Sequence, residues 1–342
     1  MKMMTKKSQA LIILVIVLVI AIAGIVLYLV LKSSPDRRCG NGFCDAREKL
    51  NPNLCPEDCK EPSNGNNQSS DIQPYFIAIH TEPTANIPEM YGVLKEYIKR
   101  ADEYNIKLTL MFSDTWADYI AESPERMDEL QEWEKSGHEI AGHHHSIYHS
   151  AWDGYTDYTL EEARAQRINQ GVKPEPYLGT MDDFMAKLKQ INPNMNSGCM
   201  NNEASKKDLP DEIIYDTCSG LYNLGEPGRN TYQAADPEIA KNEYVSVGIV
   251  NGVERKWLTH GQITDTEKQQ AAKEVFETTN SGVLGAVTHA TKRNDQNTLL
   301  LDFLDFVHEK DPTGSKSMTL TEIIESGILP EEDISVAIIN AS

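Results

Sequence analysis

The stretch Lys135-Ser-Gly-His-Glu-Ile-Ala-Gly-His-His-His-Ser-Ile-Tyr-His149 decides the fold of this chain. Its residues His138–Gly142 predict a short strand, and a run of histidines begins where that strand ends. Upstream, Ser123-Pro-Glu-Arg126 predicts the capped start of a helix that runs through Trp133. Gly137 tolerates the left-handed conformation that ends such a helix. The stretch therefore predicts a helix, a strand and then a polar cluster at the end of the strand.

The same alternation continues on both sides of this stretch. Further strands are predicted at Tyr75–His80, Ile106–Phe112 and Val283–Thr288, and further helices at Ile87–Tyr104, Thr180–Ile191 and Leu299–His308. Alternating strands and helices predict an α/β protein with a mostly parallel sheet and helices outside it. Over about 270 residues, a closed TIM-like barrel and an open sheet both fit this pattern. In either architecture, functional residues are expected at the C-terminal ends of the strands.

The charge of the chain excludes one class of function. The 342 residues carry a formal net charge of −20 at pH 7, and no basic stripe interrupts the acidic composition. An acidic surface repels the phosphates of nucleic acids. We therefore expect no nucleic-acid partner.

The N-terminal residues predict a membrane anchor. Residues Ala10–Leu31 form an apolar run without any charge, long enough for a helix that crosses a bilayer. Three lysines precede the run, which favours a cytoplasmic N-terminus and an extracellular C-terminal part. The run exceeds the core of a signal peptide and no small-x-small cleavage site follows it. We expect residues 1–33 to be a retained single-pass signal-anchor, with a cleaved signal peptide as the alternative.

Four of the six cysteines lie directly after this anchor. Residues 34–60 contain Cys39-Gly-Asn-Gly-Phe-Cys44 and Cys55-Pro-Glu-Asp-Cys59, and they resemble the CGNGxC…CPxDC units of exported surface proteins. Export permits disulfides, so we expect a disulfide-rich mini-module whose pairing the sequence leaves open. A zinc or calcium site is the alternative. Residues 61–74, rich in Pro, Ser, Asn and Gly, predict a flexible linker to a main domain at 75–342.

The histidine run is the strongest indication of chemistry. His145 and His149 are four residues apart, so both imidazoles point the same way on a helical turn. Zinc binds neutral imidazole nitrogens readily. A solvent-exposed turn without a metal would show the same spacing.

The surrounding residues resemble the NodB-like polysaccharide deacetylases. In that family a G-H-E-I strand leads into H-[ST]-x-x-H, and the resemblance extends along residues 75–326. Ile106–Phe112 matches the family's A-T-F-F strand, while Val287-Thr-His289 and Met318–Ile324 match its closing blocks. The resemblance implies a distorted (β/α) TIM-like barrel. It also implies a divalent metal, with zinc as the expected ion, bound by His145 and His149.

Two family motifs are altered here. The family's T-F-D-D-G-P supplies a base and a metal ligand, but Ala78-Ile-His-Thr-Glu-Pro83 has no aspartate pair. By this match Glu82 completes the metal triad and His80 takes the position of the base. The alternatives are that His80 is a fourth metal ligand and that Glu82 is an exposed acidic residue of a loop. The arginine of the third motif has no counterpart around Met195–Ser205.

The resemblance implies a metal-dependent hydrolase that removes N-acetyl or O-acetyl groups from a cell-surface or extracellular polysaccharide. The metal would polarise the acetyl carbonyl, His80 would take a proton from water, and His289 would protonate the leaving group as the general acid. The alternative is that His289 is a hydrogen-bonded histidine at the end of a strand without a catalytic role. The altered motifs leave open a catalytically impaired surface protein that binds glycan.

Three further residues carry weaker expectations. Cys199 and Cys218 are expected to form a third disulfide in an exported domain, with reduced buried thiols as the alternative. His260 has no counterpart in the family pattern and is expected at the surface or in a pocket.

Overall fold

One mixed sheet forms the centre of the part of the chain that the structure describes. The computed structural model describes residues 72–334 except 84–85, 174–175, 201–205 and 219–239. All of them belong to one unit, Gln68–Ser342. The predicted anchor and cysteine module lie outside the described residues, as does most of the predicted linker.

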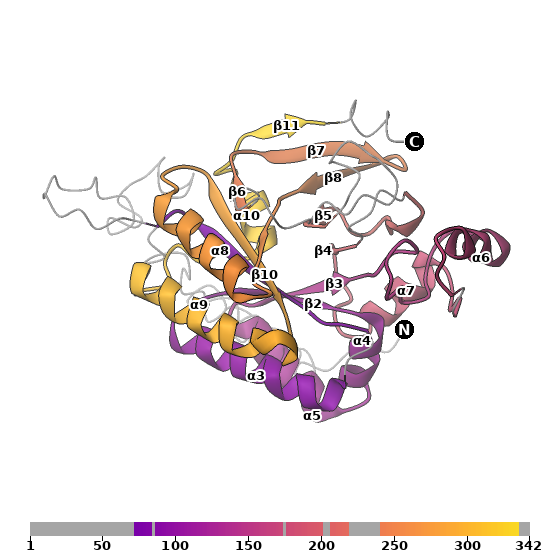
Figure 1. The fold of residues 1–342 in the computed structure, drawn as a ribbon, viewed down its shortest axis with the longest axis horizontal. Helices are drawn as coiled ribbons and strands as arrows, with labels where there is room; N and C mark the ends of the chain where they lie inside the picture. Colours follow the sequence, from indigo (N-terminus) through magenta and orange to yellow (C-terminus); the bar gives the residue numbers. More distant parts are fainter. Residues whose placement is uncertain (1–71, 84–85, 174–175, 201–205, 219–239, 335–342) are drawn as a thin grey trace, which may run out of the picture. The chain divides into compact units, whose positions relative to one another are not determined.

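Eleven strands of the described residues make up this sheet (Figure 1). They are β1 (Tyr75–His80), β2 (Leu108–Phe112), β3 (Glu139–His143), β4 (Ser197–Cys199), β5 (Tyr215–Asp216), β6 (Lys241–Asn242), β7 (Val245–Val250), β8 (Val253–Trp257), β9 (Gly261–Gln262), β10 (Val283–His289) and β11 (Glu331–Asp333). The order is β11-β7-β8-β5-β4-β3-β2-β1-β10-β6, with β9 also paired to β10. The strands from β8 to β10 along this order are parallel to one another, and β11 is parallel to β7. By contrast, β7 pairs antiparallel with β8, and β6 pairs antiparallel with β10.

Helices connect and cover the strands. They are α3 (Ile87–Glu103), α4 (Asp114–Ala121), α5 (Pro124–Lys135), α6 (Leu160–Asn169), α7 (Met181–Leu188), α8 (Thr266–Thr278), α9 (Gln296–Lys310) and α10 (Leu320–Ser326), with short 3₁₀ turns η1 (Lys206–Asp208) and η4 (Arg293–Asp295). In Figure 1, α3 and α9 lie side by side along one face of the sheet. The α/β class with a mostly parallel sheet is therefore confirmed. No pairing among the described strands joins β11 to β6, so their order is that of an open, incomplete barrel.

Strand β1 shows why the sheet is covered on both faces. All six of its residues are buried. Tyr75, Ile77 and Ile79 pack into the larger apolar cluster under the helices, and Phe76 and Ala78 pack into a second cluster. Alternate residues of a strand point to opposite faces, so a run that is apolar throughout fits a strand between two packed layers.

Local signals placed the starts of α5 and α7 and the end of α5 correctly, whereas α7 ends at Leu188 and not at the predicted Ile191. The Ser123 side chain accepts a hydrogen bond from the Arg126 amide at the start of α5, and Gly137 follows its end with φ 101°. Thr180 and Asp183 form the predicted capping box of α7. Each of these caps satisfies backbone groups that a helix end leaves unpaired.

Among the helices of the described residues, none has the length and apolar character needed to cross a membrane. The span predicted at Ala10–Leu31 lies outside those residues, so it stays a prediction.

Candidate metal centre

The chemistry-bearing residues gather at one edge of the sheet. In the parallel register His80 lies beside His289, and His143 lies beside Cys199. Each of these residues ends its strand. The carboxyl ends of parallel strands share one edge, and the loops that leave them build the site. The structure therefore brings these residues together at the C-terminal strand ends, and their role as a functional site stays a prediction.

Three side chains converge most closely at this edge: Glu82, His143 and His145. One donor atom from each lies within 4.8 Å of the others. The Nε2 atoms of His143 and His145 are 3.0 Å apart, and Glu82 Oε2 is 3.6 Å from His145 Nε2. Both imidazoles are buried, while the Glu82 side chain is 27% exposed.

Hydrogen bonds behind the two imidazoles fix their tautomers. His143 Nδ1 is 3.3 Å from the Cys199 carbonyl oxygen, and His145 Nδ1 is 2.9 Å from that of Ala151. A carbonyl only accepts, so each Nδ1 carries the proton and each Nε2 presents a lone pair. Two lone pairs that face each other at 3.0 Å require a shared cation, either a proton or a metal ion. Two imidazoles oriented from behind by carbonyls, with a carboxylate beside them, fit the three-ligand set of a catalytic zinc site.

His149 lies beside this group but is oriented differently. Its ring centroid is 4.0 Å from that of His145, so the two rings are adjacent as the sequence predicted. Its Nδ1 accepts a hydrogen bond from the Ala151 amide at 3.1 Å, which leaves the proton of the neutral ring on Nε2. Burial lowers the pKa of His149 to about 4, so the ring is neutral at neutral pH. Metal ligation by His149 stays a prediction, and His143 is the histidine that the structure adds.

A signal for His143 was present in the sequence. His143 ends the predicted strand and His145 follows two residues later. Successive residues of an extended chain alternate between faces, so residues two apart point the same way. The spacing of four between His145 and His149 predicted a helical turn, whereas the spacing of two between His143, which ends β3, and His145 is that of same-face residues in an extended chain.

His289 contacts the same carboxylate from the other side. Its Nε2 is 3.3 Å from Glu82 Oε1, and its Nδ1 is 3.1 Å from Gln296 Oε1. An amide oxygen only accepts, so Gln296 holds the proton on Nδ1 and turns Nε2 toward Glu82. Burial lowers the pKa of His289, and the charge of Glu82 opposes this shift. The imidazole is 23% exposed, so it remains accessible from solvent.

His80 lies deeper than its predicted role as a base would suggest. It is 5% exposed, and its ring stacks on His143 with centroids 4.2 Å apart. Its Nε2 is 3.9 Å from Cys218 Sγ. Burial and the neighbouring imidazoles hold its pKa well below the usual range, so it is neutral. The catalytic role of His80 stays a prediction.

A buried ion pair supports the segment that carries His145. Asp153 Oδ2 accepts hydrogen bonds from His144 Nδ1 at 2.8 Å and from the His145 amide at 3.0 Å. Burial disfavours a charged His144, but Asp153, with help from Asp208, outweighs this effect and raises the pKa of His144 to about 10. His144 is therefore a buried imidazolium that orders the segment, and it is not available as a ligand.

Arg167 of α6 clamps the same segment from the outside. Its guanidinium donates to the carbonyl oxygens of Ile147 at 3.0 Å, His149 at 2.6 Å and Ser150 at 3.4 Å. Arg167 is buried, and its fork of donors suits several carbonyls at once. No sequence pattern around Arg167 predicts this contact.

Glu82 is held through its backbone. The Trp116 indole donates to the Glu82 carbonyl oxygen at 3.1 Å, and the Ser113 amide donates to Thr81 Oγ1 at 2.9 Å. The loop after β1 is therefore tied to the start of α4. The Glu82 carboxylate remains free to face the imidazoles.

The structure also tests the predictions made for Cys199, Cys218 and His260. Cys199 and Cys218 form the predicted disulfide. His260, expected at the surface or in a pocket, is buried at 1% exposure, so the surface expectation is wrong. It follows β8 and points inward, with Nε2 at 3.6 Å from Cys218 Sγ.

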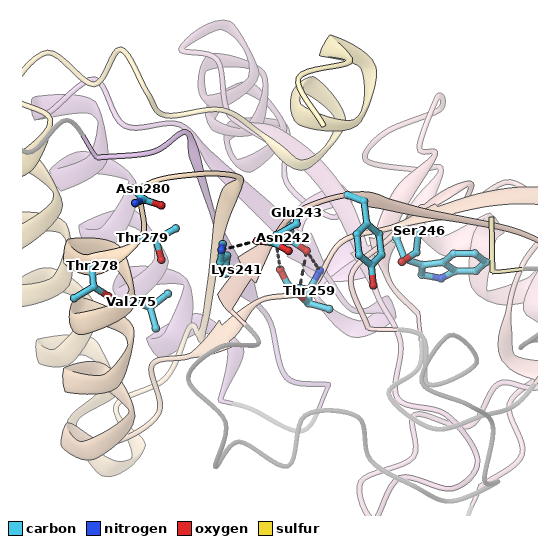
Figure 2. A pocket seen from close by; sticks show the side chains of 11 residues that line it. Lys241, Asn242, Glu243, Ser246, Thr259, Val275, Thr278, Thr279 and Asn280 are labelled. Atoms are coloured by element: carbon cyan, nitrogen blue, oxygen red, sulfur yellow. Dashed lines mark hydrogen bonds and ion pairs between the residues drawn. The ribbon is translucent and has the colours of Figure 1, made fainter. Parts of the chain in front are cut away.

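A separate pocket of about 480 Å³ lies between β6, β8 and α8 (Figure 2). Asn242 donates to the Thr259 carbonyl oxygen at 2.9 Å and accepts from the Thr259 amide at 2.7 Å, which joins the two sides of the pocket. None of the described histidines lines it. None of its lining residues belongs to a group of potential metal ligands among the described residues.

The sequence matches no protein-family model and no curated protein. Solved structures with a similar arrangement include the 4-alpha-glucanotransferase from Thermococcus litoralis, with 13% identity and a TM-score of 0.44 over 75% of this chain. The chain spans 40% of the length of that enzyme. Another is a putative polysaccharide deacetylase from Mycobacterium smegmatis, with 12% identity, a TM-score of 0.41, 78% of this chain and 93% of the other. A third is the peptidoglycan deacetylase PdaC from Bacillus subtilis, with 12% identity, a TM-score of 0.37, 75% of this chain and 92% of the other. These values do not assign the chain to a family.

Proposed function

We propose that this protein is a metal-dependent hydrolase that removes acetyl groups from an N-acetylated or O-acetylated polysaccharide. One observation carries the proposal. The lone pairs of His143 Nε2 and His145 Nε2 face each other at 3.0 Å, beside the carboxylate of Glu82. Such a set serves to bind a divalent cation in an open, reactive site.

Glu82, His143 and His145 would hold the cation, with zinc as the expected ion. When bound, it would supply a Lewis acid for the acetyl carbonyl and would lower the pKa of water. The carbonyls of Cys199 and Ala151 keep the ligating nitrogens of the two histidines deprotonated. The ligands are thus oriented before any cation arrives.

His289 is the residue best placed to move a proton. Gln296 fixes the hydrogen on Nδ1, so Nε2 is the atom that gains and loses a proton. Burial lowers the pKa of His289, which favours the neutral ring that can accept a proton from water, while the facing Glu82 carboxylate opposes this shift. The same Nε2 then returns that proton to the leaving amine or alcohol. His80 is less suited to this step because its Nε2 faces the disulfide.

The sequence supports an acetylated polysaccharide as the substrate class. The stretch 135–149 resembles the metal-binding motif of the polysaccharide deacetylases, and the predicted anchor and linker suit a polymer at the cell surface. A second candidate is a glycan-binding surface protein without activity. The absence of an aspartate pair in Ala78–Pro83 favours it.

Acetate release from acetylated polysaccharides tests the proposal. The purified full chain would be stripped with a chelator, assayed on N-acetylated and O-acetylated glycans, and assayed again after zinc is restored. We expect acetate release only with zinc, and its loss in His145→Ala. Ser150→Ala is the matched control, because Ser150 lies in the same segment and supplies only its backbone carbonyl to Arg167. A zinc-loaded protein that retains glycan and releases no acetate would support the second candidate instead.

A further inference from the structure

A second group of metal-binding side chains lies beside the proposed centre. It consists of Cys199, Cys218, His80 and His260, all of them buried. His260 Nε2 is 3.6 Å and His80 Nε2 is 3.9 Å from Cys218 Sγ. Donor atoms of His80, Cys218 and His260 all lie within 4.8 Å of one another, and those of His80, His143 and Cys199 form a similar group. In the structure the two sulfurs are joined as a disulfide.

The backbone holds the two cysteines together independently of the disulfide. Strands β4 and β5 pair in parallel with Gly198 beside Asp216, and the Thr217 amide donates to the Gly198 carbonyl oxygen at 3.0 Å. Asp216 Oδ1 accepts hydrogen bonds from the amides of Met200 at 3.2 Å and Cys218 at 2.9 Å. These bonds tie Asp216 of β5 to Met200, which follows Cys199, and to Cys218 itself. The thiols would therefore remain neighbours after the sulfur–sulfur bond is broken.

The spacing fits a tetrahedral ion. Zinc lies about 2.3 Å from thiolate sulfur and about 2.0 Å from imidazole nitrogen, which places a sulfur and a nitrogen about 3.6 Å apart around a tetrahedron. The two nitrogen–sulfur distances to Cys218 are close to that value. Two thiolates and two imidazoles also neutralise Zn²⁺, which matters because a buried unpaired charge is costly.

We propose that reduction of the Cys199–Cys218 disulfide converts this group into a zinc site with Cys199, Cys218, His80 and His260 as ligands. A dithiol reductant breaks the sulfur–sulfur bond, gives two electrons and two protons to the cysteines, and becomes a disulfide itself. The two thiols then release two protons as Zn²⁺ binds. Disulfide and bound zinc are thus alternative states of the same four residues. The site does not depend on the proposed hydrolase activity.

Cobalt binding to the full chain distinguishes the two states. The protein would be reduced with dithiothreitol, desalted without oxygen and titrated with Co²⁺, beside an oxidised sample. Ligands Glu82, His143 and His145 contain no sulfur, so thiolate-to-cobalt absorption would report only a cysteine site. We expect the reduced wild type to bind one equivalent of cobalt more, with this absorption, than the reduced protein in which Cys199 and Cys218 are both replaced by serine. Zn²⁺ should displace the cobalt.

Variants separate this site from the four N-terminal cysteines. Cys199→Ser with Cys218→Ser should lose the part of the thiolate absorption that belongs to this site, while keeping whatever the N-terminal cysteines contribute. His260→Asn keeps the disulfide and should bind cobalt at least about 10-fold more weakly at this site. Equal absorption in wild type and the double-serine variant would overturn the proposal. So would a reduced wild type that gains no cobalt, or one whose far-UV circular dichroism shows an unfolded chain that zinc does not restore.

Discussion

The imidazoles of this protein differ because of the groups behind them. Carbonyl oxygens face Nδ1 of His143 and His145, whereas an amide N–H faces Nδ1 of His149. The first arrangement leaves a lone pair on Nε2 and the second leaves a proton there. Histidines that look equivalent in the sequence therefore have different capacities for a metal.

Gln296 is expected to act through His289. Gln296→Ala removes the acceptor that keeps the hydrogen on Nδ1, so we expect kcat to fall by about 10-fold or more with little change in KM. Gln296→Glu restores an acceptor and should recover most of the rate, with a pH–rate profile shifted upward because a carboxylate raises the pKa of the imidazole. Steady-state kinetics from pH 5 to 9 would measure this. Equal rates in wild type and Gln296→Ala would contradict the positioning role.

Part of the site was predictable from single residues. The histidine run and Glu82 stand out because they follow predicted strands. The contribution of His143, and the burial of His80 and His260, depend on which residues lie behind each ring. Those neighbours, such as Cys199 and Ala151, come from other strands and turns, and the spacing of histidines holds no information about them.

At the scale of elements, the segment between β3 and α6 organises the site. It carries His145 and is held from inside by Asp153 and from outside by Arg167. Three backbone carbonyls depend on one guanidinium, and a lysine ammonium cannot reproduce that fork. The position of His145 thus depends on a helix that bears no ligand.

Arg167→Lys should therefore weaken metal binding without changing a ligand. We expect metal affinity to fall by about 10-fold to 100-fold, as for other residues that orient ligands from behind. The melting temperature should fall by a few degrees, on the order of 2–4 °C. Zinc titration and thermal unfolding would measure both, with the exposed Arg164→Lys of the same helix as control. Unchanged affinity in Arg167→Lys would show that α6 does not support the site.

Several long elements were predicted, although α8 and β7 were not, and none of the shortest strands was predicted. Strand β1, helix α5 and the capping box of α7 follow from apolar runs and cap residues. Strands β4, β5, β6 and β9 have two or three residues each, which is too short for a periodic pattern. Their pairing comes from the sheet around them. Cys199 ends β4 and Cys218 lies two residues after β5, so these two short strands position the disulfide.

Across the whole molecule, the fold buries ionisable groups close to the candidate metal centre. Asp114 begins α4 and is 3% exposed. Burial, with the charge of Asp153 as a smaller cause, raises the pKa of Asp114 to about 7. A carboxyl group whose pKa is higher in the folded state favours folding at low pH. The contribution of the protonated Asp114 to the free energy of unfolding is complete below about pH 4, and it is lost as the pH rises through about 7.

Asp114→Asn should therefore stabilise the protein at neutral and higher pH. The amide stays neutral at every pH. The free energy of unfolding of Asp114→Asn should therefore exceed that of the wild type by an amount that grows from pH 5 to pH 7 and levels off above pH 8. The gain is at most about 4 kcal/mol, since one pKa unit corresponds to about 1.4 kcal/mol. Urea unfolding at several pH values would measure it. A difference that does not vary with pH would mean that Asp114 keeps an ordinary pKa in the folded protein.

Metal content tests the central claim most directly. The full chain, purified without reductant, would be analysed for bound metal beside His143→Ala, His145→Ala and His149→Ala, each checked for folding by circular dichroism. We predict one bound divalent ion in wild type and in His149→Ala, and a loss of metal in His143→Ala and His145→Ala. Metal that persists in His143→Ala and is lost in His149→Ala would contradict the ligand set. A wild-type protein that binds no metal would contradict the metal centre itself.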